Sequence, residues 1–148
     1  MNKIFITLTT ILLLIPFINC DLETPVEEGQ LAEISASFTV WDKDSLERID
    51  DADVSVSAMA TLNGSIKSFA EESEETDYSG SAEVVLSEYI DESVGDISGS
   101  KPHLEISITR DGYESYTAES YSGAFEWIEE DEKYFSEYSY SVYLDSEN

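Results

Sequence analysis

The chain has 148 residues, and its 33 Asp and Glu against 7 Lys and Arg give a formal net charge of −26. This surplus of acid excludes nucleic acid as a partner, because binding to a phosphate backbone depends on Lys and Arg. With a single cysteine and a single histidine, the chain has neither an internal disulfide nor the three or four nitrogen and sulfur ligands that a zinc site needs.

The amino-terminal segment has the features of a secretory signal. Lys3 supplies a positive charge, an apolar run covers residues 4–18, and Asn19 and Cys20 follow. A positively charged start followed by 7–15 apolar residues is typical of such signals. The run falls short of the ~20 residues that cross a membrane as a helix. We therefore expect residues 1–19 to be a signal peptide that is removed.

The end of this segment resembles the lipobox of bacterial lipoproteins. That motif has Leu, a small or apolar residue, Gly, Ala or Ser, and then a cysteine. Here Phe17-Ile18-Asn19-Cys20 occupies these positions, and Phe17 and Asn19 depart from the pattern. The resemblance implies cleavage between Asn19 and Cys20 and lipidation of Cys20 by a diacylglycerol thioether and an N-acyl group, which together anchor a protein stably. An uncleaved amino-terminal anchor and a plain signal that leaves a free thiol remain the alternatives.

Residues 20–30 separate this signal from the rest of the chain. They are acidic, contain Pro25 and Gly29 and show no periodicity, as is typical of a linker. We expect an acidic tether here and a single domain over residues 31–148, a length that suits one hydrophobic core.

Strand-like alternation begins at the start of the domain. Between residues 31 and 41, the apolar side chains of Ile34, Ala36, Phe38 and Val40 alternate with Ser and Thr. Strict alternation of this kind indicates a strand with one buried face. Similar stretches follow at residues 54–58, 66–70, 82–86, 104–108, 113–120 and 135–144.

Turn residues separate these stretches. Asn63-Gly64 is a strong hairpin signal, because both central positions of a type I′ turn require a positive φ, and Asp111-Gly112 is a second turn. At residues 124–128 the apolar side chains are spaced too closely for a half-exposed strand, which predicts a short helical turn. About seven short antiparallel strands after a signal peptide predict an all-β fold, a single Ig-like or prealbumin-like β-sandwich.

Three short motifs resemble the carboxypeptidase regulatory-like (transthyretin-like) β-sandwich modules of secreted bacterial proteins. Residues 49–56 are similar to the start of that family's second strand, residues 76–80 to its Thr-Asp-x-x-Gly turn, and residues 108–113 to its strand ending in Gly-Tyr. Asp51 stands where the family has Gly, and the loop at residues 91–102 is extra. The resemblance implies a sandwich over nearly the whole domain and an accessory role without catalytic residues.

A search for catalytic groups favours a protein that is not an enzyme. A Ser-His-Asp triad would have to use His103, the only histidine, yet no G-x-S-x-G motif accompanies it. His103 begins a strand after Pro102, which is typical of a structural residue. A small carboxylate-dependent hydrolase stays open as an alternative. Such an enzyme would need two carboxylates about 5–9 Å apart in a cleft.

Acidic side chains offer the candidates for metal binding. Asp50, Asp51 and Asp53 cluster at one turn and Asp77 lies at another, where carboxylate oxygens are the ligands that calcium prefers. The chain has no EF-hand loop, however, and its acids are dense throughout. We expect no metal and no other cofactor, with calcium at these four residues as the alternative.

Aromatic residues gather towards the carboxyl-terminal end. Tyr121, Phe125, Trp127 and Tyr134 form the candidate binding surface, since exposed aromatic rings stack on sugars or anchor a protein partner. The alternative is a hydrophobic plug that closes one end of the sandwich.

Together these features predict a lipid-anchored, non-catalytic envelope protein that serves as an interaction or accessory module for a protein or glycan partner. We expect it at the outer membrane, on the periplasmic face or the cell surface, rather than at the inner membrane. The lipid makes the membrane contact, because anionic head groups repel an acidic domain. A glycan-binding surface lipoprotein is the alternative function.

Overall fold

The computed structural model describes residues 29–62, 65–91, 97–121 and 123–147. The predicted signal peptide, most of the tether, Asn19, Cys20 and the Asn63-Gly64 turn lie outside these residues. The described part contains no helix long and apolar enough to cross a membrane. Its strands are β1 (Gln30–Asp42), β2 (Asp53–Leu62), β3 (Ser65–Glu75), β4 (Ser81–Ile90), β5 (His103–Thr109), β6 (Tyr116–Tyr121), β7 (Glu126–Ile128) and β8 (Lys133–Leu144).

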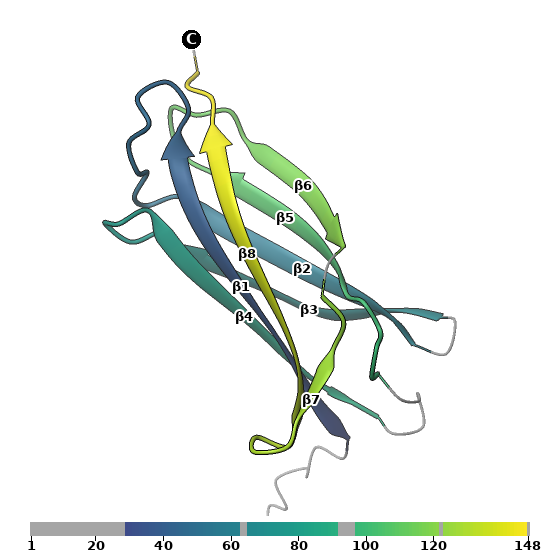
Figure 1. Cartoon of the computed structure of the whole chain (residues 1–148). Helices are drawn as coiled ribbons and strands as arrows, with labels where there is room; N and C mark the ends of the chain where they lie inside the picture. The colour runs from purple at the N-terminus through teal and green to yellow at the C-terminus, as the bar shows by residue number, and fades with distance from the viewer. Residues whose placement is uncertain (1–28, 63–64, 92–96, 122, 148) are drawn as a thin grey trace, which may run out of the picture.

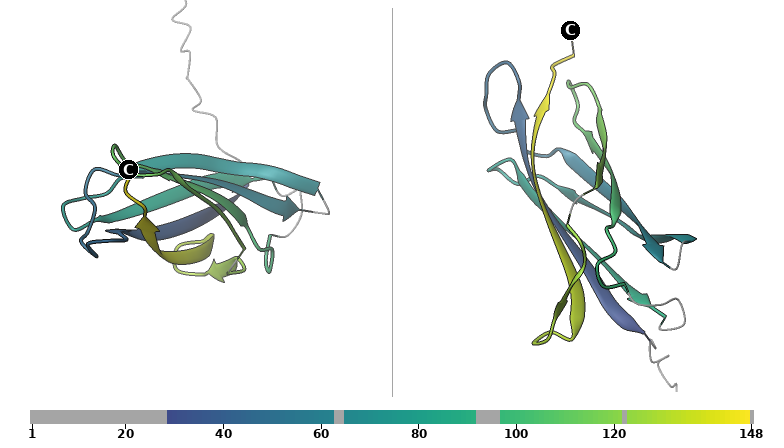
Figure 2. Two further views of the ribbon diagram at one scale, coloured as in Figure 1. Left: turned by 90° about the horizontal axis from the view of Figure 1, so that it is seen from above. Right: turned by 45° about the vertical axis from the view of Figure 1, so that its right-hand side comes forward.

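The strands form two twisted four-stranded sheets that pack face to face (Figure 1, Figure 2). The first, called here the β1 sheet, has the order β4-β1-β8-β7, and the second, the β2 sheet, has the order β3-β2-β5-β6. β1 and β8 run parallel, and the other pairs are antiparallel. The predicted all-β sandwich is confirmed, with eight strands instead of about seven. The parallel pair is possible because β1 and β8 are the first and last strands, so the rest of the sandwich forms the crossover that a parallel pair requires.

The core lies between the two sheets and follows from the alternation in the sequence. In β1, Ile34, Ala36, Phe38 and Val40 are at most 2% exposed. Full burial of one such large apolar side chain contributes about 1.5–3 kcal/mol. Phe38 also stacks on Tyr140 of the neighbouring strand, with ring centroids 5.1 Å apart. The inner faces are thus used in the core, and the outer faces remain for other contacts.

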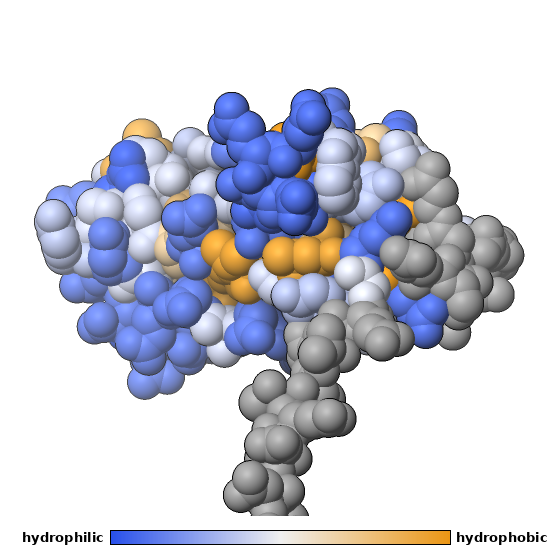
Figure 3. All heavy atoms as spheres, turned by 90° about the horizontal axis from the view of Figure 1, so that it is seen from below, coloured by the Kyte–Doolittle hydropathy of each residue, from blue (hydrophilic) through white to orange (hydrophobic). Residues whose placement is uncertain are grey.

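The surface at the lower end of the molecule is mainly hydrophilic, as the charge predicts. Seen from below, hydrophilic side chains dominate the described surface, and a hydrophobic strip shows through in the centre (Figure 3). The amino-terminal end of β1 lies at this lower end, and the carboxyl terminus lies at the opposite end (Figure 1).

Residues 124–128 do not form the expected helical turn. Phe125 enters the core, where its ring lies 5.8 Å from that of Phe69 between centroids. Its N–H donates to the carbonyl of Ser100, and its own carbonyl accepts from the N–H of Gly99. Residues 126–128 then pair with β8 as β7. The apolar side chains are closely spaced because this segment crosses from the β2 sheet to the β1 sheet, and a crossing segment has no regular exposed face.

The Thr-Asp-x-x-Gly motif ties the β3–β4 turn to the start of β2. The buried hydroxyl of Thr76 accepts from the N–H of Ala52 at 2.9 Å and donates to the carbonyl of Ile49 at 2.8 Å. Gly80 has a φ of 67°, and a Cβ at this position would lie 2.9 Å from the Cβ of Arg48. The motif therefore has a structural role in this chain.

Candidate functional site

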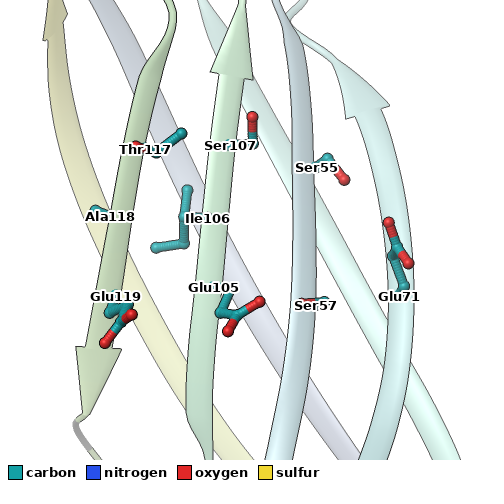
Figure 4. A pocket seen from close by; sticks show the side chains of 9 residues that line it. All are labelled: Ser55, Ser57, Glu71, Glu105, Ile106, Ser107, Thr117, Ala118 and Glu119. Atoms are coloured by element: carbon teal, nitrogen blue, oxygen red, sulfur yellow. The ribbon is translucent and has the colours of Figure 1, made fainter.

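The outer face of the β2 sheet is hollowed, with a cavity volume of about 530 Å³ (Figure 4). The alternation that sends Val54 into the core places Ser55 and Ser57 on the opposite face. Ser107 of β5 and Thr117 of β6 also line the hollow. Hydroxyl groups both donate and accept hydrogen bonds, so this surface is suited to polar ligands.

Three glutamates lie in one row across the hollow. Glu71 of β3 and Glu105 of β5 each pair in register with Ser57 of β2, and Glu119 of β6 pairs with Glu105. Figure 4 shows these side chains spread over the four strands of the sheet. Glu71, Glu105 and Glu119 are called the acidic row below.

A row of uncharged side chains lies next to the acidic row, two residues away from it on each of β2, β5 and β6. Ser107 pairs with Ser55 on one side and with Thr117 on the other. Ser55, Ser107 and Thr117 are called the hydroxyl row. Because alternate residues share a face, both rows project from the same side of the β2 sheet.

The acidic row has no Lys or Arg partner in the part of the chain that the structure describes. Among the described residues, no Lys or Arg nitrogen lies within 4.0 Å of the carboxylates of Glu71 or Glu105, and Glu119 approaches His103 Nε2 at 3.5 Å. Directly opposed side chains of an antiparallel pair have Cβ atoms about 4.5–5.5 Å apart, and like charges there are destabilising. Two unit charges about 5 Å apart repel by about 0.8 kcal/mol in bulk water. The electrostatics at Glu105 and Glu119 therefore favour a cation between them.

An aromatic pair borders the acidic row on the side away from the hydroxyl row. His103 and Tyr121 pair in register, and their rings stack with centroids 4.2 Å apart and an angle of 10°. Tyr121 is 67% exposed. The 3.5 Å between His103 Nε2 and Glu119 is too long for a strong hydrogen bond. His103 thus packs against Tyr121 on the outer face of the sheet.

A second hollow, of about 510 Å³, lies on the same face nearer the carboxyl terminus. Asp53 of β2 lies four residues before Ser57 and pairs with Glu75 of β3 and Thr109 of β5. Both hollows therefore lie along the same strands, β2, β3 and β5. The acids that line the second hollow are Asp51, Asp53, Glu75, Asp111 and Glu147, and Arg110 is the basic residue among them.

Three of the four acids considered for calcium lie near this second hollow. Arg110 Nη2 is 3.8 Å from Asp50 and 3.7 Å from Asp51, and Asp53 faces the hollow. Among the described residues, no three His, Cys, Asp or Glu side chains come close enough to share a metal ion. The structure thus gives Asp50 and Asp51 a guanidinium as neighbour.

The fourth acid, Asp77, is used inside its own turn. Its carboxylate accepts hydrogen bonds from the hydroxyl and the N–H of Ser79, at 2.6 and 2.8 Å, and from the N–H of Ser81 at 3.0 Å. These bonds, led by that of the Ser79 hydroxyl, lower the pKa of Asp77. Asp77 therefore fixes the turn and does not converge with the other three acids.

The four aromatic residues of the candidate binding surface do not form one platform. Phe125 is 2% exposed and belongs to the core. Trp127 is 48% exposed and stands edge-on to the buried ring of Tyr134, with centroids 5.0 Å apart. Tyr121 lies on the β2 sheet, whereas Trp127 and Tyr134 lie on the β1 sheet. Trp127 and Tyr121 are thus exposed on different sheets.

An aromatic group on the outer face of the β1 sheet was missed at the sequence level. Trp41 and Tyr143 pair in register, and their rings stack with centroids 6.2 Å apart. The guanidinium of Arg48 lies 4.1 Å from the centre of the Trp41 ring, a favourable cation–π contact. The alternation of β1 indicates that Trp41 faces outward, but it says nothing of these partners. Arg48 covers the Trp41 ring, so this face of the ring is closed to a sugar.

The outer face of the β1 sheet contains acids that have partners. Lys133 Nζ lies 2.8 Å from the carboxylate of Glu33, and this hydrogen bond raises the pKa of Lys133. Glu83 accepts a hydrogen bond from the hydroxyl of Ser35 at 2.9 Å. Glu71 and Glu105 on the β2 sheet have no such cation among the described residues, which distinguishes the two faces.

Comparison with known proteins gives similarity in fold alone. No family model matches the chain, and no curated protein matches it. A point mutant of catechol 1,2-dioxygenase from Acinetobacter radioresistens superimposes with a TM-score of 0.52 at 15% identity, over 80% of this chain and 53% of that protein. For 3-chlorocatechol 1,2-dioxygenase from Rhodococcus opacus the values are 0.47, 15%, 83% and 62%. An alternative pilotin from the type II secretion system of Vibrio cholerae gives 0.39, 12%, 80% and 99%.

These comparisons correct one expectation and leave another without support. The chain spans about half to three fifths of the length of the two dioxygenases. The expectation that the protein is not an enzyme, drawn from the missing catalytic motifs and from the module type, is corrected by this comparison, because the chain is similar in fold to part of a dioxygenase; at 15% identity the similarity is one of fold alone. The β-sandwich that the carboxypeptidase regulatory-like motifs implied is present, but no family model places the chain in that family.

Proposed function

We propose that this protein is a lipid-anchored component of a bacterial cell envelope that binds a partner through the outer face of its β2 sheet. The observation that carries the proposal is the hollow of about 530 Å³ on that face, lined by hydroxyl and carboxylate side chains. Concave sites with a few convergent polar groups are where proteins usually bind ligands. The location we propose is the outer membrane, on its periplasmic face or at the cell surface.

The proposed anchor is the lipid on Cys20. The resemblance of residues 17–20 to a lipobox supports it, and so does the charge of the chain, −26, because an acidic domain is repelled by anionic lipid head groups and needs an acyl anchor. Cys20→Ser should move the protein from envelope fractions into the soluble fraction. A variant that stays as firmly attached as the wild type would contradict the anchor.

The binding face is tested separately from the anchor. Ser107→Tyr fills the hollow from the middle of the hydroxyl row without changing the charge, and its side chain points away from the core. We expect the full chain, purified in detergent, to capture a partner from envelope extract, and the Ser107→Tyr protein to lose that partner. Ser139→Tyr on the outer face of the β1 sheet, at an exposed position, is the control and should keep it.

Glycan binding at Trp127 is a second candidate, favoured by the 48% exposure of its ring. Retention of the protein on immobilised envelope glycan should then be lost in Trp127→Ala while the fold persists. Equal retention of the variant and the wild type would remove this candidate.

A further inference from the structure

The proposed function leaves the partner unspecified, and the β2 sheet carries enough detail to narrow it. Building on that function, we infer that the outer face of the β2 sheet binds an extended peptide segment with two basic side chains, Arg or Lys, about four positions apart. Three features of this face support the inference: the acidic row, the acids of the second hollow and the hydroxyl row between them.

The acidic row provides the first basic subsite. Glu105 and Glu119 are directly opposed on β5 and β6, and no Lys or Arg of the described residues lies within ion-pair distance of Glu105. A guanidinium between these two carboxylates would turn a repulsive pair into two attractive ones, and Arg presents its donors in a fork that matches carboxylates. Tyr121, 67% exposed beside this row, offers a ring on which the side chain can stack.

The second hollow provides the second basic subsite. Asp53 pairs with Glu75, so two carboxylates again lie on neighbouring strands. Asp53 and Ser57, which lies in line with the acidic row, are four residues apart on β2. At about 3.4 Å per residue, the two groups of acids are about 14 Å apart along the strand, and because one lies on β5 and β6 and the other on β2 and β3, they are also about 10 Å apart across the sheet. Side chains four positions apart on one face of an extended peptide have the same spacing along the strand, and the long, flexible side chains of Arg or Lys cover the offset across the sheet.

The hydroxyl row fits the stretch of peptide between the two basic side chains. Ser55, Ser107 and Thr117 lie between the acidic row and Asp53 along the strands. They can donate to the carbonyls and accept from the N–H groups of a peptide backbone. A bare divalent cation would not use them, and the described acids form no group that could share a metal ion. The arrangement therefore suits a peptide whose polar backbone carries two separated basic side chains.

The test uses the full chain in detergent and labelled nine-residue peptides of Ser and Thr, read by fluorescence anisotropy. One peptide has Arg at positions 3 and 7, a second has Gln at both positions, and a third has Arg at positions 3 and 4. We expect the first to bind, the second not to bind, and the third to bind several-fold more weakly. Equal binding of the first two would overturn the basic ligand, and equal binding of the first and third would overturn the extended arrangement.

Matched variants separate the site from the general charge of the protein. Glu105→Gln with Glu119→Gln should weaken binding of the first peptide about tenfold, as expected for the loss of two exposed charge pairs. Glu88→Gln with Glu129→Gln removes the same charge from exposed positions outside the hollow and should change binding less than twofold. Equal weakening by both pairs would show attraction by net charge alone and overturn the site.

The same variants distinguish this inference from the proposed function. If Ser107→Tyr abolishes capture of the envelope partner while the basic peptide fails to bind the wild type, the face is a binding site and the basic ligand is wrong. If Ser107→Tyr leaves capture unchanged, the proposed function itself fails.

Discussion

Gly80 shows how one position in a turn sets the local backbone. Its φ of 67° is in the left-handed region, and a Cβ would lie 2.9 Å from the Cβ of Arg48 and 3.0 Å from the carbonyl oxygen of Val40. A non-glycine residue in this conformation costs about 1–2 kcal/mol, and the close contact adds to that cost. Gly112 has a φ of 85°, and a Cβ placed there would meet no atom within 4 Å. It therefore has the same backbone requirement without the contact.

We therefore expect Gly80→Ala to lower the free energy of unfolding by about 2–4 kcal/mol and Gly112→Ala by about 1–2 kcal/mol. Urea unfolding of the two variants side by side measures the difference. Equal losses of stability would mean that the β1–β2 connection, which contains Arg48, shifts to make room for the methyl group and that packing at Gly80 is loose.

Asp77 predicts a pH dependence of stability. The hydrogen bonds from Ser79 and Ser81 hold its pKa in the folded protein below the ordinary value of 3.8. A depressed carboxylate pKa stabilises the folded state above the unfolded-state pKa, and this contribution is lost as the pH falls through the folded-state pKa. Asp77→Asn should therefore be less stable than the wild type near neutral pH, with the difference shrinking below about pH 4. A difference that stays constant from neutral to acid pH would show that the charge of Asp77 is not the cause.

At the scale of the elements, the segment from Phe125 to β7 contains one core residue and one surface residue. Phe125 is 2% exposed and packs on Phe69, whereas Trp127 is 48% exposed. Phe125→Ala should lower the free energy of unfolding by about 3–5 kcal/mol, as is usual for a buried Phe, and Trp127→Ala by less than about half of that. Urea unfolding measures both. Similar losses would mean that Trp127 closes the sandwich instead of offering its ring to a ligand.

Strands could be predicted from the sequence because the signal for them is local. The alternation at Ile34, Ala36, Phe38 and Val40 specifies a strand and its buried face before any partner is known, and all four are buried. The close spacing of apolar residues around Phe125 predicted a helical turn that is not present, because a segment that crosses from one sheet to the other has no regular hydrophobic period. The pairing of β1 with β8 depends on strands that are far apart in the sequence.

The candidate site could not be predicted from the sequence for the same reason. Glu105 and Glu119 are 14 positions apart in the sequence, and their juxtaposition depends on the register of β5 with β6. Alternation shows that both side chains face outward, but only the register places them opposite each other. Short-range patterns therefore favoured the aromatic residues near Trp127, which are close in sequence and come from two sheets.

At the scale of the whole molecule, the two faces of the sandwich have different electrostatic characters. On the β1 sheet, Lys133 is bonded to Glu33. On the β2 sheet, the acidic row and the acids of the second hollow extend along the same strands, and Arg110 is the basic residue that lines the second hollow. A molecule anchored at its amino-terminal end would present this face along its side, because the strands run from the end where β1 begins to the end with the carboxyl terminus (Figure 1).

The net charge of −26 predicts that salt stabilises the protein. Like charges on a compact surface repel, and at 0.15 M ionic strength interactions beyond about 8 Å are largely screened. The melting temperature should therefore rise with NaCl. CaCl₂ at equal ionic strength should raise it no further, because Asp77 is bonded within its turn and Asp50 and Asp51 face Arg110. An additional shift with calcium that Asp53→Asn abolishes would show that these acids rearrange around a bound ion, and the second hollow would then be a metal site instead of a subsite for a basic side chain.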